Sequence, residues 1–320
     1  MKKILITGIT GLLGSYLAKS HAGKAQISGL KRQNSSTRLL GNLASQINWY
    51  EGEITDVELL IEACKDQDLV IHAAGMVSFD ESQKEALLET NTQGTACMVN
   101  AMLSSNCKKL VFISSVAALG KDAVPLINED QKWVNSPLNT PYAISKHLAE
   151  LEVWRGAQEG LEVMVFNPSI LLAKIGDERS SSQIYRYLLE GNRYFPIGDL
   201  NYIDIRDAVS QINSMINSGP WGQRYIINKE AISYEKFFKE MAKAFKLTPP
   251  KKPLNNWLAM LVINWSTFYN YFSKNKIPVT RQTIKSAQSK IRYDNQKINT
   301  ITKYTYTSLT DTFKWAISVN

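Results

Sequence analysis

The chain has 320 residues, of which 44% are hydrophobic and 21% are charged, a balance typical of a globular protein with a sizeable core. Its formal charge of +8 is concentrated in the last third, but without the aromatic-basic pattern or reading helix of a nucleic-acid-binding protein. The three cysteines show neither metal-ligand spacing nor an even-numbered disulfide set, so we expect no metal site and a cytoplasmic location.

Strand-like and helix-like segments alternate up to Pro168, and this alternation predicts a parallel sheet with helices on both faces. We expect strands at residues 4–7, 26–30, 48–51, 69–72, 110–114 and 162–166, and helices at 11–20, 57–65, 81–106 and 141–159. The fold class is therefore α/β, with a Rossmann-type doubly wound parallel sheet.

The pattern loosens after Pro168. Here we expect helices at residues 183–189, 206–217 and 233–245, a strand at 225–227, and a stiff, proline-rich linker at 248–253. We assign a dinucleotide-binding domain to residues 1–167 and about 201–227. A smaller, mixed substrate-binding domain takes about 168–200 and 228–320.

Residues 254–272 include no charged side chain, but their four asparagines argue against a membrane span. We expect a helix here that is buried or lines the substrate groove. Its tryptophans and tyrosines leave contact with a membrane surface as the alternative.

The glycines Gly8, Gly11 and Gly14 follow the first predicted strand and open the first predicted helix. Glycines let the backbone turn sharply and approach a pyrophosphate, and the N-terminus of the helix attracts its negative charge. The spacing differs from the standard Gly-x-Gly-x-x-Gly fingerprint, so a strand-to-helix turn without a ligand is the alternative.

Tyr142 and Lys146 are four residues apart and share one face of a predicted helix. A lysine cation beside a tyrosine favours the phenolate, so we expect Lys146 to lower the pKa of Tyr142 toward a value useful for acid–base chemistry. Ser114 and Ser115 end a predicted strand, where ligands of open α/β sheets bind. Ser115 is the candidate whose hydroxyl bonds the substrate oxygen.

In their order along the chain, these motifs resemble the extended short-chain dehydrogenase/reductase superfamily, which includes the NAD-dependent epimerases and dehydratases. The resemblance is carried by residues 7–14, 72–75, 91–95, 142–146, 167–169 and 202–207, with Ser115 between them. It implies that Tyr142 is the general acid/base, that Lys146 also holds the nicotinamide ribose, and that Ser115 positions the substrate carbonyl or hydroxyl.

The resemblance also implies a set of cofactor contacts spread over residues 8–169. These residues are Gly8, Thr10, Gly11, Leu12, Leu13, Glu53, Ile54, Ala73, Ala74, Gly75, Asn91, Tyr142, Lys146, Asn167, Pro168 and Ser169.

The end of the second predicted strand bears on the choice between NAD and NADP. A carboxylate there binds the ribose hydroxyls of NAD, whereas an arginine accommodates the 2′-phosphate of NADP. The strand ends in Lys31 and Arg32, and no carboxylate appears before Glu51. We therefore expect NADP(H) to be preferred over NAD(H).

The residues after Ser115 are Val116 and Ala117, without the acidic pair of sugar dehydratases. The chain is most similar to the reductase branch, which includes dihydroflavonol-4-reductase-like and 3β-hydroxysteroid dehydrogenase-like enzymes. This similarity implies hydride transfer between the cofactor and a small carbonyl or alcohol substrate, in a monomer or a homodimer. A nucleotide-sugar epimerase and a non-catalytic NADP-binding sensor are the alternatives.

Overall fold

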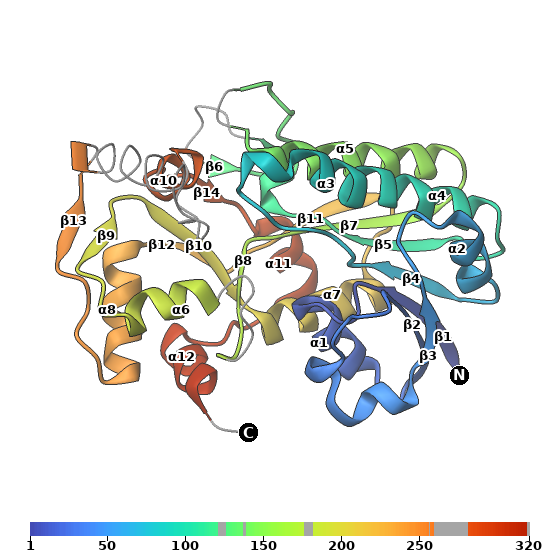
Figure 1. Ribbon diagram of the computed structural model, residues 1–320, viewed down its shortest axis with the longest axis horizontal. Helices are drawn as coiled ribbons and strands as arrows, with labels where there is room; N and C mark the ends of the chain where they lie inside the picture. The colour runs from blue at the N-terminus through green and yellow to red at the C-terminus, as the bar shows by residue number, and fades with distance from the viewer. Residues whose placement is uncertain (121–125, 137–138, 176–181, 256, 259–280, 319–320) are drawn as a thin grey trace.

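The computed structural model describes residues 1–120, 126–136, 139–175, 182–255, 257–258 and 281–318 (Figure 1). Its largest element is a sheet of seven parallel strands in the spatial order β11-β7-β5-β4-β1-β2-β3. The strands are β1 (Lys2–Thr7), β2 (Ala25–Lys31), β3 (Asn48–Glu51), β4 (Leu69–His72), β5 (Lys109–Ile113), β7 (Glu162–Pro168) and β11 (Gln223–Ile227). The strand order reverses at β1, which confirms the predicted doubly wound Rossmann-type sheet.

Two hydrophobic cores cover the two faces of this sheet, because successive side chains of a strand point to opposite faces. Ile4 and Ile6 belong to the core that includes α1 (Leu12–His21) and α7 (Ile205–Ser218). Leu5 belongs to the other core, which is covered by α2 (Val57–Cys64), α4 (Gly94–Leu103) and α5 (Pro141–Gln158). The helices therefore hold the sheet from both sides.

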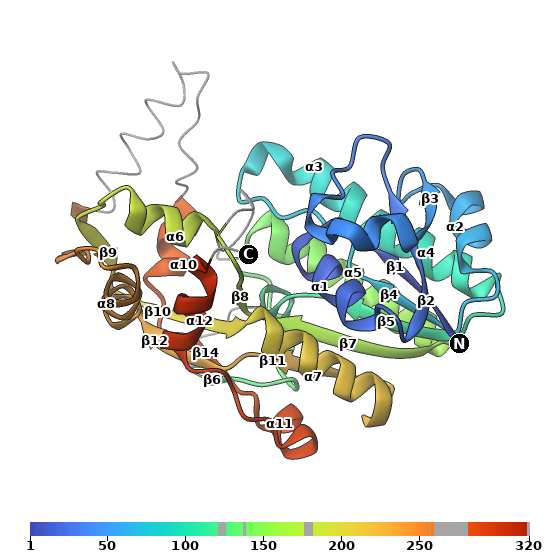
Figure 2. The same cartoon turned by 90° about the horizontal axis from the view of Figure 1, so that it is seen from below.

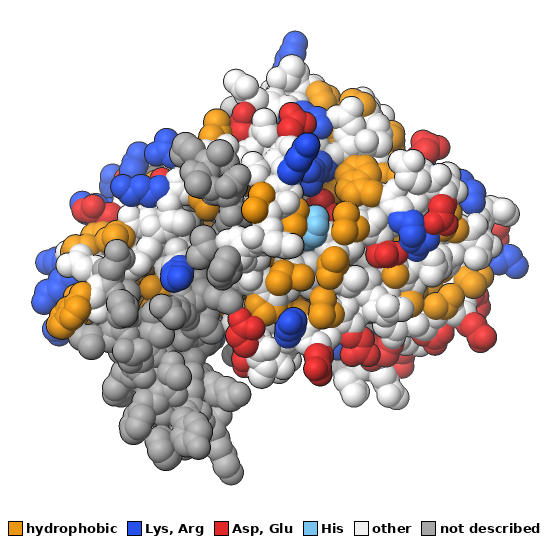
Figure 3. All heavy atoms as spheres, turned by 90° about the horizontal axis from the view of Figure 1, so that it is seen from above, with side chains coloured by type: hydrophobic (Ala, Val, Ile, Leu, Met, Phe, Trp, Pro, Cys, Tyr) orange, Lys and Arg blue, Asp and Glu red, His pale blue; other side chains and the backbone are white. Residues whose placement is uncertain are grey.

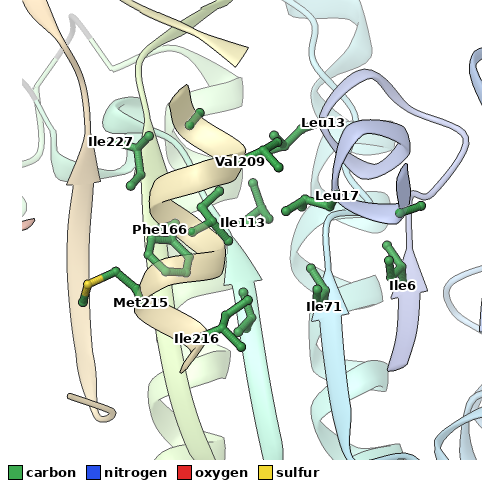
Figure 4. Packing of buried hydrophobic residues seen from close by; sticks show 14 of the residues in the cluster. Ile6, Leu13, Leu17, Ile71, Ile113, Phe166, Val209, Met215, Ile216 and Ile227 are labelled. Carbon is green, nitrogen blue, oxygen red and sulfur yellow. The ribbon is translucent and has the colours of Figure 1, made fainter. Parts of the chain in front are cut away.

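Figure 4 shows the first of these cores, where Leu17 of α1 and Val209 and Ile216 of α7 lie over Ile71 and Ile113 of the sheet. All five side chains are at most 8% exposed. Burying one such side chain contributes about 1.5–3 kcal/mol. This packing holds α1, and hence the glycine turn before it, against the sheet.

A smaller mixed part lies beside the large sheet, at the left of Figure 1, and Figure 2 shows it from below. Its three-stranded sheet has the order β12-β10-β8, and aromatic side chains such as Tyr185, Phe237 and Phe313 fill its core. Its main elements are β8 (Ile170–Leu172), α6 (Ser182–Leu189), β10 (Asp199–Asp204), β12 (Glu230–Ser233), α8 (Tyr234–Phe245) and α12 (Leu309–Ile317).

Shorter elements complete the described chain. β13 (Lys252–Leu254) pairs with β9 (Tyr194–Pro196), and β14 (Arg292–Tyr293) pairs with β6 (Leu126–Ile127). The others are η1 (Arg38–Gln46), η2 (Glu81–Gln83), α3 (Lys84–Leu87), η3 (Leu88–Gln93), η4 (Val116–Leu119), α10 (Arg281–Ala287) and α11 (Gln296–Thr302).

Two predicted elements differ from the structure. The single helix expected at 81–106 is divided into η2, α3, η3 and α4, and η3 is a π-helical turn that includes Asn91. π-Turns occur where a side chain needs a particular direction, and the Asn91 amide bonds the backbone of Met76. The expected linker at 248–253 ends in β13, because its last residues pair with β9.

The apolar segment predicted at residues 254–272 lies almost entirely outside the described residues. Among the residues that the structure does describe, no helix combines the length and the hydropathy needed to cross a membrane.

The close approach of Gly8 to the loop after β4 can be tested with Gly8→Ala. A Cβ at residue 8 would lie 2.5 Å from the carbonyl carbon of Ala73, and Gly8 has a φ of +65°. We expect the clash to cost about 1–3 kcal/mol in the free energy of unfolding, in addition to about 1–2 kcal/mol for the left-handed backbone. Chemical denaturation measures both terms together.

Gly23→Ala is the matched control, since Gly23 has a φ of +72° but nothing lies within 4 Å of its added Cβ. It should show only the backbone cost. Equal losses in the two variants would contradict the close contact between Gly8 and Ala73.

Candidate active site

The glycine turn lies at the carboxyl end of β1. The amide of Gly11 donates to the carbonyl of Gly8 at 2.9 Å, and α1 begins at Leu12 without a side-chain cap. The free amides of the first turn thus face the switch point of the sheet and could bind an anion. Of the predicted contacts here, the side chain of Leu13 packs into the core, so only its backbone is available to a ligand.

A chain of buried hydrogen bonds joins the end of β1 to His72 of β4 and to Thr95 of α4. The hydroxyl of Thr95 donates to the carbonyl of Asn91 at 2.5 Å, so it must accept from Nε2–H of His72, 3.1 Å away. Nδ1 of His72 then accepts from the hydroxyl of Thr7 at 2.6 Å, and Thr7 accepts from the amide of Ala74 at 3.3 Å. His72 is therefore held as the neutral Nε2–H tautomer.

His72 is fully buried, and it stacks on Phe112 with the ring centroids 5.6 Å apart. Burial, with a smaller contribution from the cation of Lys146, lowers the pKa of His72 to about 3. Its role here is to connect Thr7 and Thr95, and a neutral imidazole with both nitrogens bonded is no general base.

Asn91 holds the loop that follows β4. Its Oδ1 accepts from the amide of Met76 at 2.7 Å, and its Nδ2 donates to the carbonyl of Met76 and to Oγ of Ser145, both at 2.9 Å. Ser145 is on α5, between Tyr142 and Lys146, so Asn91 links the predicted cofactor loop to the predicted catalytic helix.

Tyr142 and Ser115 meet at the carboxyl end of β5. A hydrogen bond with Ser115 lowers the pKa of Tyr142, but burial has the larger effect and raises it above the usual value of 10.0. The Ser115 hydroxyl also accepts from the amide of Ala117 at 3.2 Å. Ser114 lies beside this contact, but its hydroxyl has no partner among the described residues.

Lys146 lies one turn further along α5 and is 4% exposed. Its Nζ donates to the carbonyl of Ile113 at 2.8 Å and lies 4.4 Å from the centroid of the Phe112 ring. Burial lowers the pKa of Lys146 to about 8. The expectation that Lys146 lowers the pKa of Tyr142 is not borne out, because the ammonium group is directed at the end of β5.

A profile of the NAD dependent epimerase/dehydratase family matches residues 4–227. The chain belongs to this family. Its sequence relatives include a protein of Synechocystis sp. named "Putative dihydroflavonol 4-reductase", 28% identical over 80% of this chain and 76% of that protein. Cinnamoyl-CoA reductase 2 of Arabidopsis thaliana is 24% identical over 79% of each chain, and UDP-glucose 4-epimerase of Neisseria meningitidis serogroup C is 32% identical over 47% of each.

Solved structures share the fold over nearly the whole chain. The crystal structure of gox2253 has a TM-score of 0.82 at 25% identity and covers 99% of this chain and 97% of that one. WbmH of Bordetella bronchiseptica, solved with NAD+, has a TM-score of 0.77 at 19% identity over 99% and 97%. The family binds NAD(P) and comprises oxidoreductases and epimerases, which supports an enzyme.

The residues of this site fit such a cofactor. Gly8 leaves no room for a side chain beside the loop at Ala73, as a close backbone approach requires. Among the described residues, Oδ1 of Asn167 and the hydroxyls of Ser114 and Ser169 are buried without a hydrogen-bond partner. Such orphaned groups at the carboxyl ends of β5 and β7 are suited to a bound polar ligand.

At the end of β2, the structure leaves Arg32 but not Lys31 available to a 2′-phosphate, whereas the sequence suggested both. Lys31 forms an ion pair with Glu51 at 2.5 Å, because β3 pairs with β2 in a register that puts these residues side by side. Arg32 makes no side-chain hydrogen bond or ion pair within the described part of the chain. Glu53 is exposed nearby, and Ile54 packs against Gly94.

Two residues near this site, Val77 and Phe79, were not found from the sequence. Phe79 contacts Tyr142 edge-on, with the ring centroids 6.2 Å apart. The side chains of Phe79 and Val77 are both exposed, by 44% and 59%. Figure 3 shows hydrophobic side chains gathered across the face that α3 and α5 line. Phe79 follows the cofactor-loop motif by only a few residues, but nothing in the sequence indicated that it reaches Tyr142.

The burial of His72 predicts a specific pH dependence of stability. The pKa of His72 is about 3 in the folded chain and near 6.5 in the unfolded chain. Between these pH values the unfolded state therefore binds one proton more than the folded state. The contribution of neutral His72 is complete above pH 6.5 and is lost as the pH falls, by up to ~1.4 kcal/mol per pH unit. Urea unfolding at a series of pH values measures this slope.

His72→Gln should flatten the slope, whatever it costs in stability at neutral pH. His147→Gln, at the partly exposed histidine of α5, is the control and should change the slope less. An unchanged slope in His72→Gln would show that His72 is not held neutral.

Proposed function

We propose that the protein is an NADP(H)-dependent oxidoreductase that reduces a ketone or aldehyde, or oxidises the corresponding alcohol. The observation that carries this proposal is the cluster of Ser115, Tyr142 and Lys146 at the carboxyl end of β5. The cluster lies beside the cofactor-shaped turn and loop, which Asn91 connects to α5. The reductases among the sequence relatives support the same chemistry.

The glycine turn and the amides at the start of α1 would hold the pyrophosphate, and the loop from Ala73 to Gly75 would lie along the dinucleotide. Lys146 would hold the nicotinamide ribose, and residues 167–169 would lie near the nicotinamide. When bound, NADPH supplies the hydride that reduces the carbonyl carbon. The substrate-binding part is proposed to comprise about residues 168–200 and 228–320.

Tyr142 is the proposed general acid of the reduction. As the carbonyl carbon gains the hydride, its oxygen gains the proton of the Tyr142 hydroxyl, and the product is the alcohol. The Ser115 hydroxyl bonds both Tyr142 and the reacting oxygen, and this bond favours the phenolate that remains. A raised pKa keeps Tyr142 protonated before the transfer, as an acid requires.

Tyr142→Phe should lower kcat by about 10²–10⁴-fold, because it removes the transferred proton and leaves the ring in place. The affinity for NADPH should stay close to that of the wild type, since the ring only borders the cofactor. Following NADPH absorbance with a panel of ketones and aldehydes measures the first quantity, and quenching of protein fluorescence measures the second.

Tyr225→Phe on β11 is the matched control and should leave both quantities unchanged, because its hydroxyl bonds the carbonyl of Pro220 before that strand begins. Full activity in Tyr142→Phe would overturn the role of Tyr142. A wild type that binds NADPH tightly but reduces no carbonyl would favour the NADP-binding sensor.

The NADP preference now depends on Arg32. Lys31 is neutralised by Glu51, so it offers little charge to a 2′-phosphate. Arg32 follows β2 directly and is exposed, and its guanidinium matches the geometry of a phosphate. Ser35 and Ser36 follow within a tight turn, in which the amide of Ser35 donates to the carbonyl of Arg32 at 2.9 Å.

Arg32→Ala should weaken NADPH binding roughly tenfold or more and change NADH binding little, because a charged hydrogen bond to the phosphate is lost. Thermal shift titrations with both cofactors measure this difference. Lys31→Ala should have a smaller effect, and the exposed Arg193→Ala on the other part of the chain should have none. Stronger stabilisation of the wild type by NADH would overturn the NADP preference.

Epimerisation of a nucleotide sugar is the second candidate. Two observations favour it: the Neisseria UDP-glucose 4-epimerase is 32% identical over 47% of this chain, and Glu51 puts a carboxylate beside the end of β2. An epimerase regenerates its cofactor in each cycle, so it would interconvert UDP-sugars without net consumption of NADPH. Chromatography of the sugars after incubation with UDP-sugars therefore detects an epimerase, whereas the NADPH absorbance assay with carbonyls detects a reductase.

A further inference from the structure

Glu150 is a buried acid on the catalytic helix, one turn beyond Lys146. Its side chain is only 2% exposed, whereas the other acid of α5, Glu152, is partly exposed. A buried carboxylate is costly unless it is paired and hydrogen-bonded. Its partners therefore indicate what it does.

Two side chains from neighbouring strands hold the Glu150 carboxylate. Nδ2 of Asn167, at the end of β7, donates to Oε1 at 2.5 Å. Nη1 of Arg224, on β11, lies 3.3 Å from Oε2. Glu150 thus connects α5 to the two outer strands of the large sheet.

Asn167 continues toward the site, whereas Arg224 holds the segment that follows β6. Nδ2 of Asn167 also donates to the carbonyl of Ser115 at 3.0 Å. The guanidinium of Arg224 donates to the carbonyls of Glu129 and Gln131, at 2.8 and 3.1 Å. Through Asn167, the carboxylate has a connection to the backbone of the serine that bonds Tyr142.

We propose that Glu150 is a positioning residue, which keeps Lys146 cationic and fixes the backbone at Ser115 through Asn167. This inference rests on the oxidoreductase function proposed above. Glu150 touches no reacting atom in this scheme, and it acts through Lys146 and Ser115. Among the described residues, Glu150 is the acid whose charge acts on Lys146.

The electrostatic surroundings of Lys146 support this role. Burial lowers the pKa of Lys146 to about 8, and the charge of Glu150 opposes the decrease. The other groups that face the pair are Tyr142 on α5 and His72 on β4, both uncharged at neutral pH, and Arg224 on β11. Beyond Arg224 lie His147, whose pKa is lowered by burial and then by Arg224, and Glu129, with Lys297 and Asp294 near it.

Glu150→Gln tests the proposal, because it keeps the size and an oxygen for Asn167 but removes the charge. Without that charge the pKa of Lys146 falls, so activity is lost at a lower pH when the lysine deprotonates. We expect the alkaline limb of kcat/KM for carbonyl reduction to move down by about one pH unit. The alkaline limb of NADPH binding should move in the same direction, since Lys146 holds the ribose.

Glu152→Gln is the matched control, on the same helix but paired with Arg155 at 2.9 Å and partly exposed. It should leave both limbs in place, and Glu150→Asp should restore them in part. If Glu150→Gln lowers the rate equally at every pH and neither limb moves, Glu150 is merely structural and the proposal is wrong.

The double variant Glu150→Gln/Arg224→Gln is used if the single variant does not fold, because it leaves no unpaired guanidinium. It should show the same shift of both limbs, and unmoved limbs would overturn the proposal. The pH dependence of NADPH binding also separates the role of Glu150 from the proposed oxidoreductase function. If no carbonyl is reduced, the proposed function fails, while the pH dependence of NADPH binding still decides the role of Glu150.

Discussion

The contact between the backbones of Gly8 and Ala73 is the constraint on which the site depends. It brings the turn after β1 and the loop after β4 together at the point where the strand order reverses. The contact is held on one side by the packing of α1 and on the other by the hydrogen bonds of Thr7 and His72. A side chain at residue 8 would force the two segments apart, and with them the surface that a dinucleotide needs.

Burial controls the chemistry of the groups around this contact. It keeps His72 neutral and Tyr142 protonated, and it brings the pKa of Lys146 down to about 8. Because this pKa is close to neutral pH, the cationic form of Lys146 depends on a nearby negative charge. Glu150 is the acid that provides it. The proposed reductase chemistry therefore depends on buried charges whose neighbours come from four different strands and one helix.

The strands and helices of the large sheet could be predicted because alternating apolar segments and glycine turns are local signals. The order of motifs around Gly8, Asn91, Tyr142 and Lys146 likewise indicated the family that the profile then showed. Other features could not be found this way. The ion pair of Lys31 with Glu51 depends on the register between β2 and β3, and the break in the helix at Asn91 depends on its bonds to Met76.

The sequence by itself determined the sheet and the glycine turn, and it gave the side chains proposed to move a proton, because each follows from the residues next to it in the chain. Only the tertiary structure decided how these groups are charged and what they touch. Thr7, His72 and Thr95 form one chain of hydrogen bonds, and Glu150 meets Asn167 and Arg224, because parallel strands distant in sequence end at the same edge. Pairings of that kind, and the burial that shifts a pKa, depend on packing between segments.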